Sequence, residues 1–468
     1  MNRISATINF SFLITISFSC ILFSSCIKKS TDGMIIFTQL NGKERGINIE
    51  KGNFPQTRIV AVENSKSMEK VLTADFYSAR SPEISFDGKF MLFTAQKKQN
   101  DQWQIWEINL ENLKTRQVIS SKENCIDPAY LPGGRFVFTR FSSADTLNTG
   151  HSLFTCNLTG SDIRQITFNP HSWSGSVVLN DGRILTLSQA LFPIKKEPEF
   201  KVLRPDGTKA DLFYQAPDGN LLSGRGRETT NGKIVFIESD KNNHELGSVI
   251  SISYNRPLHT RVNLTSAISG SFKNVFPLPS GKLLVSYRKS EDDRYALFEF
   301  DPERRVLGQA IYDNKDFDVL EAVEVVKHVR PKKLPSEVDM GVKSGLLMCQ
   351  DINVFDIHPT GKLKASIIKV IGKDSTLGIV QVAEDGSFYL KVIADTPFKI
   401  QTIDGKGNVL DGPCDWIWLR PNERRGCVGC HEDPEMVPEN KVPVAVRKSP
   451  VIIPMHITKV VEKKVSLE

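Results

Sequence analysis

Short apolar runs, each bounded by a turn signal, recur along most of the chain. A turn residue, a glycine, a basic residue and an apolar residue follow one another five times, with the glycines 46 to 50 residues apart. Glycine accepts the positive φ angle of a tight hairpin, so each copy predicts two antiparallel strands joined by a turn. The copies are Asp87-Gly88-Lys89-Phe90, Gly133-Gly134-Arg135-Phe136, Asp181-Gly182-Arg183-Ile184, Asn231-Gly232-Lys233-Ile234 and Ser280-Gly281-Lys282-Leu283.

Further strand-like runs follow each hairpin, and four short strands every 45 to 50 residues are the pattern of a propeller blade. Asp32-Gly33-Met34 opens an earlier copy, so six copies predict a six-bladed β-propeller over residues 33–315. Gly33 stands 55 residues before Gly88, which makes this first copy the longest. The ring closes either with strands of this first copy or with a strand from outside the repeat. Closure by an outside strand would change the blade count by one.

After the repeats, the pattern predicts a linker at 316–343 and a second domain at 344–468. The linker contains a basic, proline-bearing stretch, and β character then returns without the blade period. Beyond Trp416 prolines become frequent, which indicates irregular chain. The fold class is therefore all-β: a six-bladed propeller followed by a small β-sandwich-like domain with an irregular C-terminal loop. Strands are expected at 346–349, 365–370, 378–382, 387–392 and 398–402.

The run Cys427-Val428-Gly429-Cys430-His431 lies in that loop and is the pattern of a c-type haem attachment site. Two thiols at this spacing can bond the two vinyl groups of one porphyrin, and the imidazole of His431 then ligates the iron. A redox Cys-x-x-Cys pair would open a helix after a strand, and a zinc site would need a second ligand pair nearby. Neither context surrounds the run, so we expect one covalent haem c.

The N-terminus fits this expectation, because c-type haem is attached outside the cytoplasm. A weakly positive start and an apolar run at 8–23 predict a signal peptide over residues 1–25. Small residues before Cys26 resemble a relaxed lipobox, which predicts lipidation of Cys26 and a periplasm-facing, membrane-anchored lipoprotein. The alternative is ordinary cleavage and a secreted protein. The net charge of +6 is spread along the chain, so we expect no nucleic-acid partner.

Several residues around the predicted haem keep two interpretations. Arg420, Arg424 and Arg425 fit either propionate partners or a solvated basic loop, and Trp416 and Trp418 fit either core or porphyrin packing. Outside the cytoplasm the remaining cysteines fit either disulfides or buried thiols; they are Cys125, Cys156, Cys349 and Cys414. The distal iron ligand also stays open, with the candidates Met436, Glu435, Met455, His456, His358 and His328.

Two stretches of the chain carry family resemblances. The stretch from Ser81 to Lys89 resembles the repeat of TolB-type propellers. The chain also resembles the family named for the middle domain of the hydrazine synthase alpha subunit. This second resemblance rests on a propeller of this kind followed by the segments 384–388, 394–397 and 424–432. This resemblance implies a covalent c-type haem on Cys427 and Cys430.

The resemblance does not by itself imply hydrazine synthesis. That enzyme is a multi-subunit complex, and its alpha subunit carries a second haem in a further domain with no counterpart in this sequence. In the catalytic version of the middle domain, a tyrosine four residues after the motif histidine contacts the iron, and the histidine turns to zinc. Glu435 stands at the tyrosine position here, so His431 is expected to be a plain axial ligand.

These observations lead us to expect a membrane-anchored electron-transfer protein that docks a redox partner on its propeller. No Ser-His-Asp triad, carboxylate pair or phosphate loop stands out in the sequence, which favours transfer over catalysis. The alternative is a haem enzyme that acts on a small nitrogen or oxygen species, and a third possibility is a propeller lipoprotein used as a binding scaffold. The coordination of the iron distinguishes an electron-transfer protein from a haem enzyme, because an iron atom with an open coordination position can bind a substrate.

Overall fold

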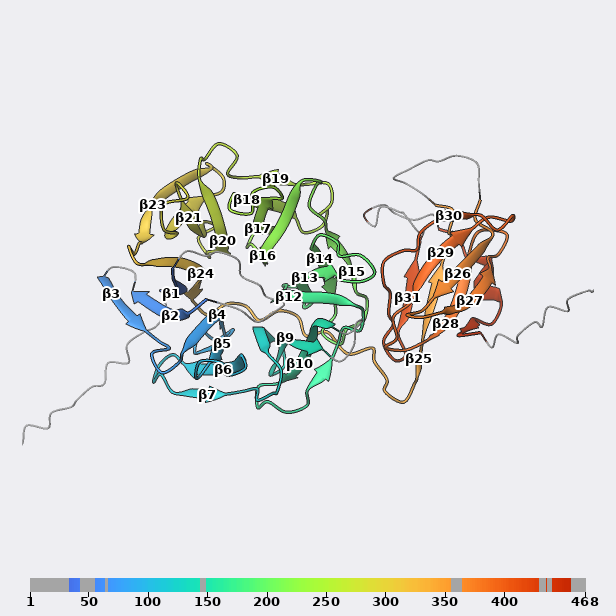
Figure 1. Ribbon diagram of the computed structural model, residues 1–468, viewed down its shortest axis with the longest axis horizontal. Coiled ribbons are helices and arrows are strands. Elements are labelled where there is room, and N and C mark those ends of the chain that lie inside the picture. The colour runs from blue at the N-terminus through green and yellow to red at the C-terminus, as the bar shows by residue number, and fades with distance from the viewer. Residues whose placement is uncertain are drawn as a thin grey trace, which may run out of the picture. The chain divides into compact units, whose positions relative to one another are not determined.

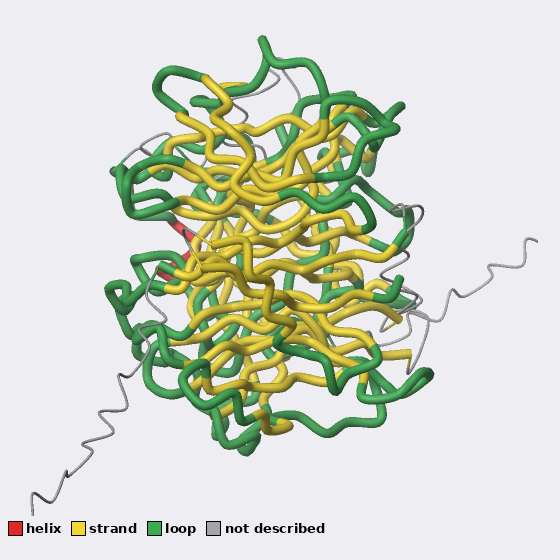
Figure 2. The backbone as a smooth tube through the Cα atoms, turned by 90° about the vertical axis from the view of Figure 1, so that its left-hand side faces the viewer, coloured by secondary structure: helices red, strands yellow, loops and turns green. Residues whose placement is uncertain are grey.

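The computed structural model describes residues 33–42, 55–63, 66–143, 149–354, 364–428, 435 and 440–455. Strands dominate this part of the chain, and its one helix is the short 3-10 helix η2 (Val444–Arg447), drawn in red in Figure 2. The predicted all-β fold is therefore confirmed. Within these residues no helix is both long enough and apolar enough to cross a membrane.

Strands β1 to β24 form six four-stranded antiparallel sheets, which Figure 1 shows arranged as propeller blades around a common centre. We number the sheets 1 to 6 in chain order, starting with the one that contains β1. Neighbouring inner strands contact one another in turn, and the contact of β24 with β4 closes the ring. Sheets 1 to 3 comprise β1 (Met34–Asn41), β2 (Thr57–Glu63), β3 (Lys66–Val71) and β24 (Phe317–Val325); β4 (Ser78–Ile84), β5 (Phe90–Gln96), β6 (Gln104–Asn109) and β7 (Thr115–Gln117); and β8 (Cys125–Leu131), β9 (Arg135–Ser143), β10 (Thr149–Asn157) and β11 (Arg164–Gln165).

Sheets 4 to 6 repeat the same plan, with the first strand innermost and each later strand one step further out. They comprise β12 (His171–Val178), β13 (Ile184–Ala190), β14 (Glu199–Leu203) and β15 (Asp211–Tyr214); β16 (Asn220–Glu228), β17 (Lys233–Asp240), β18 (Gly247–Ser253) and β19 (Val262–Asn263); and β20 (Ser271–Pro277), β21 (Leu283–Arg288), β22 (Ala296–Asp301) and β23 (Val306–Tyr312).

Sheet 1 joins the two ends of the propeller. Its inner strand β24 pairs antiparallel with β1, so that Ile35 lies opposite Glu324 and Leu40 opposite Asp318. Strand β24 therefore belongs to the propeller although it lies after residue 315, in the predicted linker. The repeat pattern does not show this strand, because the residues that it pairs with in β1 are 276 to 291 positions away in sequence.

The inner strands carry a shared β-bulge next to the central channel. The register of each inner strand shifts by one or two residues. In three of these strands a non-glycine residue at this point adopts positive φ, namely Ser81 (57°), Asp127 (52°) and Glu321 (52°). The Ser81 hydroxyl donates to Asp127 (3.0 Å) and its amide donates to Glu321 (2.8 Å). The bulges thus join neighbouring sheets by hydrogen bonds around a small cavity of about 130 Å³.

The segment after β24 crosses the propeller at the hairpin turns that the sequence predicts. The amide of His328 donates to the carbonyl of Phe86 (3.1 Å), and that of Lys332 donates to the carbonyl of Asn180 (3.1 Å). Gly182 has a φ of +91°, and a Cβ atom there would lie 2.1 Å from the carbonyl oxygen of Lys332. This turn therefore needs glycine both for its backbone conformation and for the passage of the linker.

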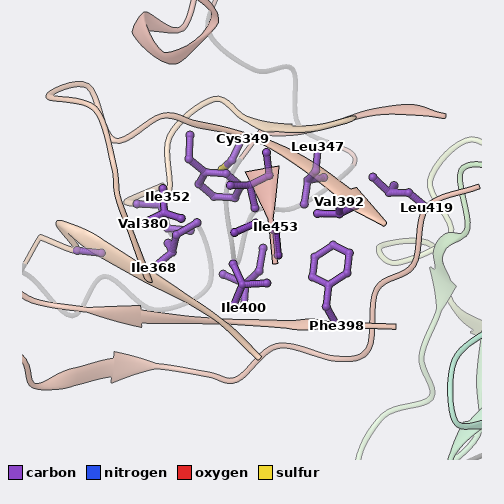
Figure 3. Close-up of a cluster of buried hydrophobic side chains, with 14 residues drawn as sticks. Leu347, Cys349, Ile352, Ile368, Val380, Val392, Phe398, Ile400, Leu419 and Ile453 are labelled. Atoms are coloured by element: carbon purple, nitrogen blue, oxygen red, sulfur yellow. The ribbon is translucent and has the colours of Figure 1, made fainter. Parts of the chain in front are cut away.

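The C-terminal β domain consists of two four-stranded sheets that enclose one hydrophobic core, part of which Figure 3 shows. One sheet has the order β31-β25-β28-β32 and the other the order β27-β26-β29-β30. All five strands expected from the sequence are present, and each bound lies within two residues of the expected one. The strands are β25 (Ser344–Cys349), β26 (Ile367–Ile371), β27 (Thr376–Gln381), β28 (Phe388–Ile393), β29 (Lys399–Ile403), β30 (Val409–Asp411), β31 (Arg424–Cys427) and β32 (Val451–Ile453).

The proline-rich C-terminal region is more regular than its sequence suggests. Strand β31 pairs parallel with β25, and β32 pairs parallel with β28. Each is only three or four residues long and lies at an edge of its sheet, where a few hydrogen bonds to a preformed neighbour are enough to fix it. Cys427 is therefore the last residue of a strand, and the loop that carries the haem motif starts from the edge of a sheet.

Candidate functional site

Strand β31 positions the first cysteine of the Cys-x-x-Cys-His run. Cys427 lies opposite Cys349 of β25, is half-buried and packs against the core of the β domain. Its carbonyl accepts a hydrogen bond from the amide of Gln350 (2.8 Å), and the carbonyl of Val428 accepts one from Asp351 (3.0 Å). The strand therefore holds the backbone of this first cysteine in place. Cys430 and His431 lie outside the described residues, as does Cys26.

A buried carboxylate fixes the start of β31. The side chain of Glu423 is 0% exposed and accepts hydrogen bonds from the amides of Lys209 (2.8 Å) and Arg420 (2.7 Å). Arg425 adds an ion pair, with its Nη2 2.7 Å from Oε1 of Glu423. A buried carboxylate is tolerated only when its oxygens are paired in this way. Lys209 belongs to the turn between β14 and β15, so Glu423 connects the strand that leads to Cys427 with sheet 4.

Two of the three arginines that fitted either propionate partners or a solvated basic loop are ion-paired within the protein. Arg420 is buried, with Nη1 2.8 Å from Asp395, and its guanidinium lies 4.6 Å from the ring centre of Phe168. Arg425 is paired with Glu423. Arg424 is exposed and makes no ion pair with another described residue. The geometry therefore leaves Arg424 as the candidate propionate partner among the three.

The two tryptophans before the motif pack against the propeller. The indole of Trp416 donates a hydrogen bond to the carbonyl of Phe192 (2.9 Å). Trp418 meets Trp173 of β12 edge to face, with ring centres 5.9 Å apart, and both are buried. Of the two interpretations that the sequence left open, core packing is the one observed.

A polar cluster between sheet 4 and the β domain was not evident from the sequence. His171 Nε2 lies 3.2 Å from Asp415 Oδ1, and Lys201 Nζ lies 3.0 Å from both Asp415 Oδ2 and Glu199 Oε1. Burial lowers the pKa of His171 despite its hydrogen bond to Asp415. Burial by itself would raise the pKa of Asp415. The hydrogen bond from His171 and the positive charge of Lys201 outweigh burial and hold this pKa well below its usual range.

This cluster contains three side chains that could bind a metal ion, because ligand atoms of His171, Glu199 and Asp415 lie within 4.8 Å of one another. The ammonium group of Lys201 already forms an ion pair with each of the two carboxylates. The arrangement therefore acts as a link between propeller and β domain. No sequence motif could have shown it, since Asp415 is more than 200 residues from the other members.

Glu435, four residues after His431, contacts the propeller. Its side chain is 8% exposed and accepts a hydrogen bond from the amide of Leu258 (2.7 Å), with Arg256 Nε at 3.5 Å. The two other described candidates for the distal iron ligand pack elsewhere. His328 meets Phe86 edge to face, with ring centres 5.3 Å apart, and Met455 packs near Gly378. His358, Met436 and His456 lie outside the described residues.

The remaining cysteines are thiols. Cys125, Cys156 and Cys349 are buried and Cys414 is partly exposed, and none of them forms a disulfide. Burial raises the pKa of Cys125 and of Cys156 to about 12 and that of Cys414 to about 11. Of the two interpretations that the sequence allowed, buried thiols are observed.

A cavity of about 740 Å³ lies between sheet 3, the linker and the β domain, and it was not predicted. Its size suits a small organic molecule. The ion pair of Arg420 and Asp395 forms one wall, which connects the cavity with the segment that leads to Cys427. Apolar side chains make up much of the rest, among them Ile163, Ile166, Phe168, Leu334, Val338 and Met340.

Comparison with known proteins identifies the segment that contains this site. Residues 348–432 match the family described as hydrazine synthase alpha subunit middle domain. These residues belong to that family. The resemblance predicted from the sequence is thus confirmed, and the matched segment runs from β25 to the end of the Cys-x-x-Cys-His run.

The match extends beyond this segment at low identity. Hydrazine synthase subunit alpha of Kuenenia stuttgartiensis is 23% identical over an alignment that covers 85% of this chain and 65% of the relative, so the chain spans less than two thirds of that protein. The solved Kuenenia stuttgartiensis hydrazine synthase matches with a TM-score of 0.78 and 20% identity, over 89% of this chain and 72% of that chain. TolB from Acinetobacter baumannii matches with a TM-score of 0.45 and 15% identity, over 64% and 67%.

These comparisons correct the expected function. The sequence led us to expect an electron-transfer protein of the c-type cytochrome kind, and this expectation is wrong. The curated relative and the matched family are both named for a subunit of an enzyme, not for a cytochrome. The argument from the sequence failed because it took the lack of a triad or carboxylate pair as a sign of no catalysis, whereas a bound cofactor can supply the chemistry.

Proposed function

We propose that this chain is the haem-bearing part of an enzyme that acts on a small nitrogen or oxygen species, as a counterpart of the hydrazine synthase alpha subunit. The observation that carries the proposal is the match of residues 348–432 to the middle domain of that subunit, because the matched segment ends in the Cys-x-x-Cys-His run. When bound, a c-type haem would supply an iron atom that binds and reduces or oxidises such a species.

The described residues fit a covalently attached haem. Cys427 carries a thiol rather than a disulfide, is half-buried, and ends a strand whose backbone is fixed by β25. The neighbouring Arg424 is exposed, so its guanidinium is available to an anionic group. In this proposal Cys427 and Cys430 hold the haem by thioether bonds and His431 ligates the iron.

The rest of the chain positions this segment. Glu423 fixes the start of β31 against sheet 4, and Glu435 attaches the chain beyond the motif to the loop after β18. The motif is therefore held between two contacts with the propeller. Glu435 also stands where the catalytic version of the family has an iron-contacting tyrosine. Its carboxylate is held by Leu258 and Arg256, so we propose that the ligand set of this enzyme differs from that version.

We further propose that the enzyme works with at least one other protein. The curated relative is named as a subunit, and this chain spans 65% of its length. A partner would bring the electrons that the iron needs. The predicted signal peptide and the lipid on Cys26 would place this assembly at the periplasmic face of a membrane.

Covalent haem and turnover test the proposal together. The full chain is produced with a c-type maturation system and assayed for haem that survives denaturing electrophoresis. The wild type should carry such haem, and Cys427→Ser with Cys430→Ser should lose it. The loaded wild type should then consume nitric oxide or hydroxylamine in the presence of a reductant, while Glu197→Ala, changed at an exposed propeller site, should behave like the wild type. A loaded protein that turns over neither compound would contradict the proposal.

A further inference from the structure

Cys349 and Cys427 lie side by side on neighbouring strands. The parallel pairing of β25 with β31 places the two residues directly opposite each other. Directly paired residues point to the same face of a sheet, and both cysteines pack in the core of the β domain. Figure 3 shows Cys349 within that core. Cys349 is thus a third thiol next to the predicted haem site.

The separation of the two residues suits a disulfide. Neighbouring strands lie about 4.8 Å apart, and disulfides join residues whose Cα atoms are about 4.4 to 6.8 Å apart. Each cysteine is also the last residue of its strand, since β25 ends at Cys349 and β31 ends at Cys427. The amide of Gln350 donates to Cys427 and that of Asp351 donates to Val428, so the pairing continues past both cysteines and fixes the separation of their Cα atoms. Rotation of the two side chains then brings the sulfur atoms into bonding distance.

The two thiols differ in access. Cys349 is 1% exposed, whereas Cys427 is only half-buried. A dissolved oxidant therefore reaches Cys427 first, and Cys349 is placed to react with the product. In this order Cys427 is the attacking thiol and Cys349 is the resolving thiol.

We propose that Cys349 is part of the attachment site and forms a disulfide with Cys427 in the haem-free chain. The oxidant is a small disulfide such as oxidised glutathione. The Cys427 thiolate attacks one sulfur of the oxidant and releases one thiol, and the Cys349 thiolate then displaces the second. Two protein thiols and one disulfide thus become one protein disulfide and two small thiols.

This disulfide and a haem thioether exclude each other. This step of the inference rests on the proposed function, in which Cys427 binds haem. Formation of the thioether adds the S–H group of Cys427 across a vinyl group of the porphyrin. A Cys427 sulfur bonded to Cys349 has no hydrogen to add. Haem attachment would then require prior reduction of the Cys349–Cys427 bond.

Peptide mapping tests the disulfide without haem. The haem-free full chain is incubated with oxidised glutathione, alkylated, digested without reduction and analysed by mass spectrometry. We expect a linked peptide pair containing Cys349 and Cys427, retained in Cys430→Ser and Cys414→Ser and absent in Cys349→Ala. Cys414 is the matched control, because it is another thiol of the β domain. Linkage of Cys427 to Cys430 alone, or a Cys427 that stays a thiol, would overturn the proposal.

A maturation assay tests the consequence separately. Oxidised wild type should need a higher dithiothreitol concentration for half-maximal haem attachment than oxidised Cys349→Ala. Equal requirements would show that Cys349 does not compete for Cys427. If neither chain attaches haem, the proposed function fails, and the peptide map still decides whether the disulfide forms.

Discussion

The backbone amide of Lys209 in the propeller donates a 2.8 Å hydrogen bond to the buried carboxylate of Glu423 in the β domain. Glu423 stands four residues before Cys427, and the same carboxylate also binds the amide of Arg420 and the guanidinium of Arg425. One side chain therefore fixes the start of β31, orders the arginines around it and joins the predicted haem segment to sheet 4.

Removal of this carboxylate should destabilise the junction between the two domains. Glu423→Ala removes the carboxylate partner of Arg425 and the acceptor of the Lys209 and Arg420 amides, which costs about 3 kcal/mol of unfolding free energy. Urea denaturation followed by tryptophan fluorescence measures this loss, since Trp416 and Trp418 lie at the same junction. Glu197→Ala, whose exposed partner is Lys241, should change stability by less than about 0.5 kcal/mol. Equal effects of the two substitutions would contradict the anchoring role.

Gly182 and Gly232 offer a matched pair for testing the path of the linker. Both have positive φ, but only at Gly182 would a Cβ meet the linker, 2.1 Å from the carbonyl oxygen of Lys332. Gly232→Ala should therefore cost only the backbone strain of about 1 to 2 kcal/mol. Gly182→Ala should cost more and also increase proteolytic cleavage near Lys332 and Lys333. A similar cleavage rate in both variants would show that the linker does not cross this turn.

The cluster around His171 should make stability depend on pH. Burial lowers the pKa of His171 below the unfolded value of about 6.5, so the unfolded chain binds a proton that the folded chain does not. Stability is then lost as pH falls below about 6.5, by up to about 1.4 kcal/mol per pH unit. The groups that face His171 are Asp415, Lys201 and Glu199, and the low pKa of Asp415 keeps that carboxylate ionised throughout this range.

Urea denaturation at pH 7.5, 6 and 5 measures this dependence. His171→Gln should flatten the decline in unfolding free energy between pH 6.5 and 5 relative to the wild type. His328→Gln, at an exposed histidine of the linker, should leave the decline unchanged. An unchanged slope in His171→Gln would mean that this histidine does not bind its proton on unfolding.

Lipidation of Cys26 is a separate prediction from the sequence. Radiolabelled palmitate should enter the wild-type chain but not Cys26→Ala, because only a cysteine at the cleavage site accepts the lipid. Mass spectrometry of the mature N-terminus is the second readout. Equal labelling of both chains, or retention of residues 1–25, would exclude this anchor.

Local pattern was enough to predict most of the fold. The glycines of the hairpin turns have the positive φ angles that the sequence required, as Gly88 (71°) and Gly281 (83°) show, and the five predicted strands of the β domain are present. The three-residue strand β30 was missed, and strands β24, β31 and β32 were missed for a physical reason. Their stability comes from pairing with distant strands, not from their own short sequences.

The candidate site was only partly predictable, because its contacts join distant parts of the chain. The Cys-x-x-Cys-His run marked the attachment point, but nothing local places Cys349 opposite Cys427 or Asp415 beside His171. Both relationships depend on strand register and on domain packing. Trp416 and Trp418 likewise fitted two interpretations until their propeller partners were seen.

The coordination of the haem iron tests the central claim most directly. The absorption spectrum of the loaded ferric protein is recorded, and carbon monoxide is then added to the ferrous form. The account predicts a high-spin, five-coordinate ferric spectrum and stoichiometric binding of carbon monoxide, because an enzyme that acts on a small molecule needs an open iron position. A six-coordinate low-spin spectrum in both oxidation states, with no binding of carbon monoxide, would contradict it.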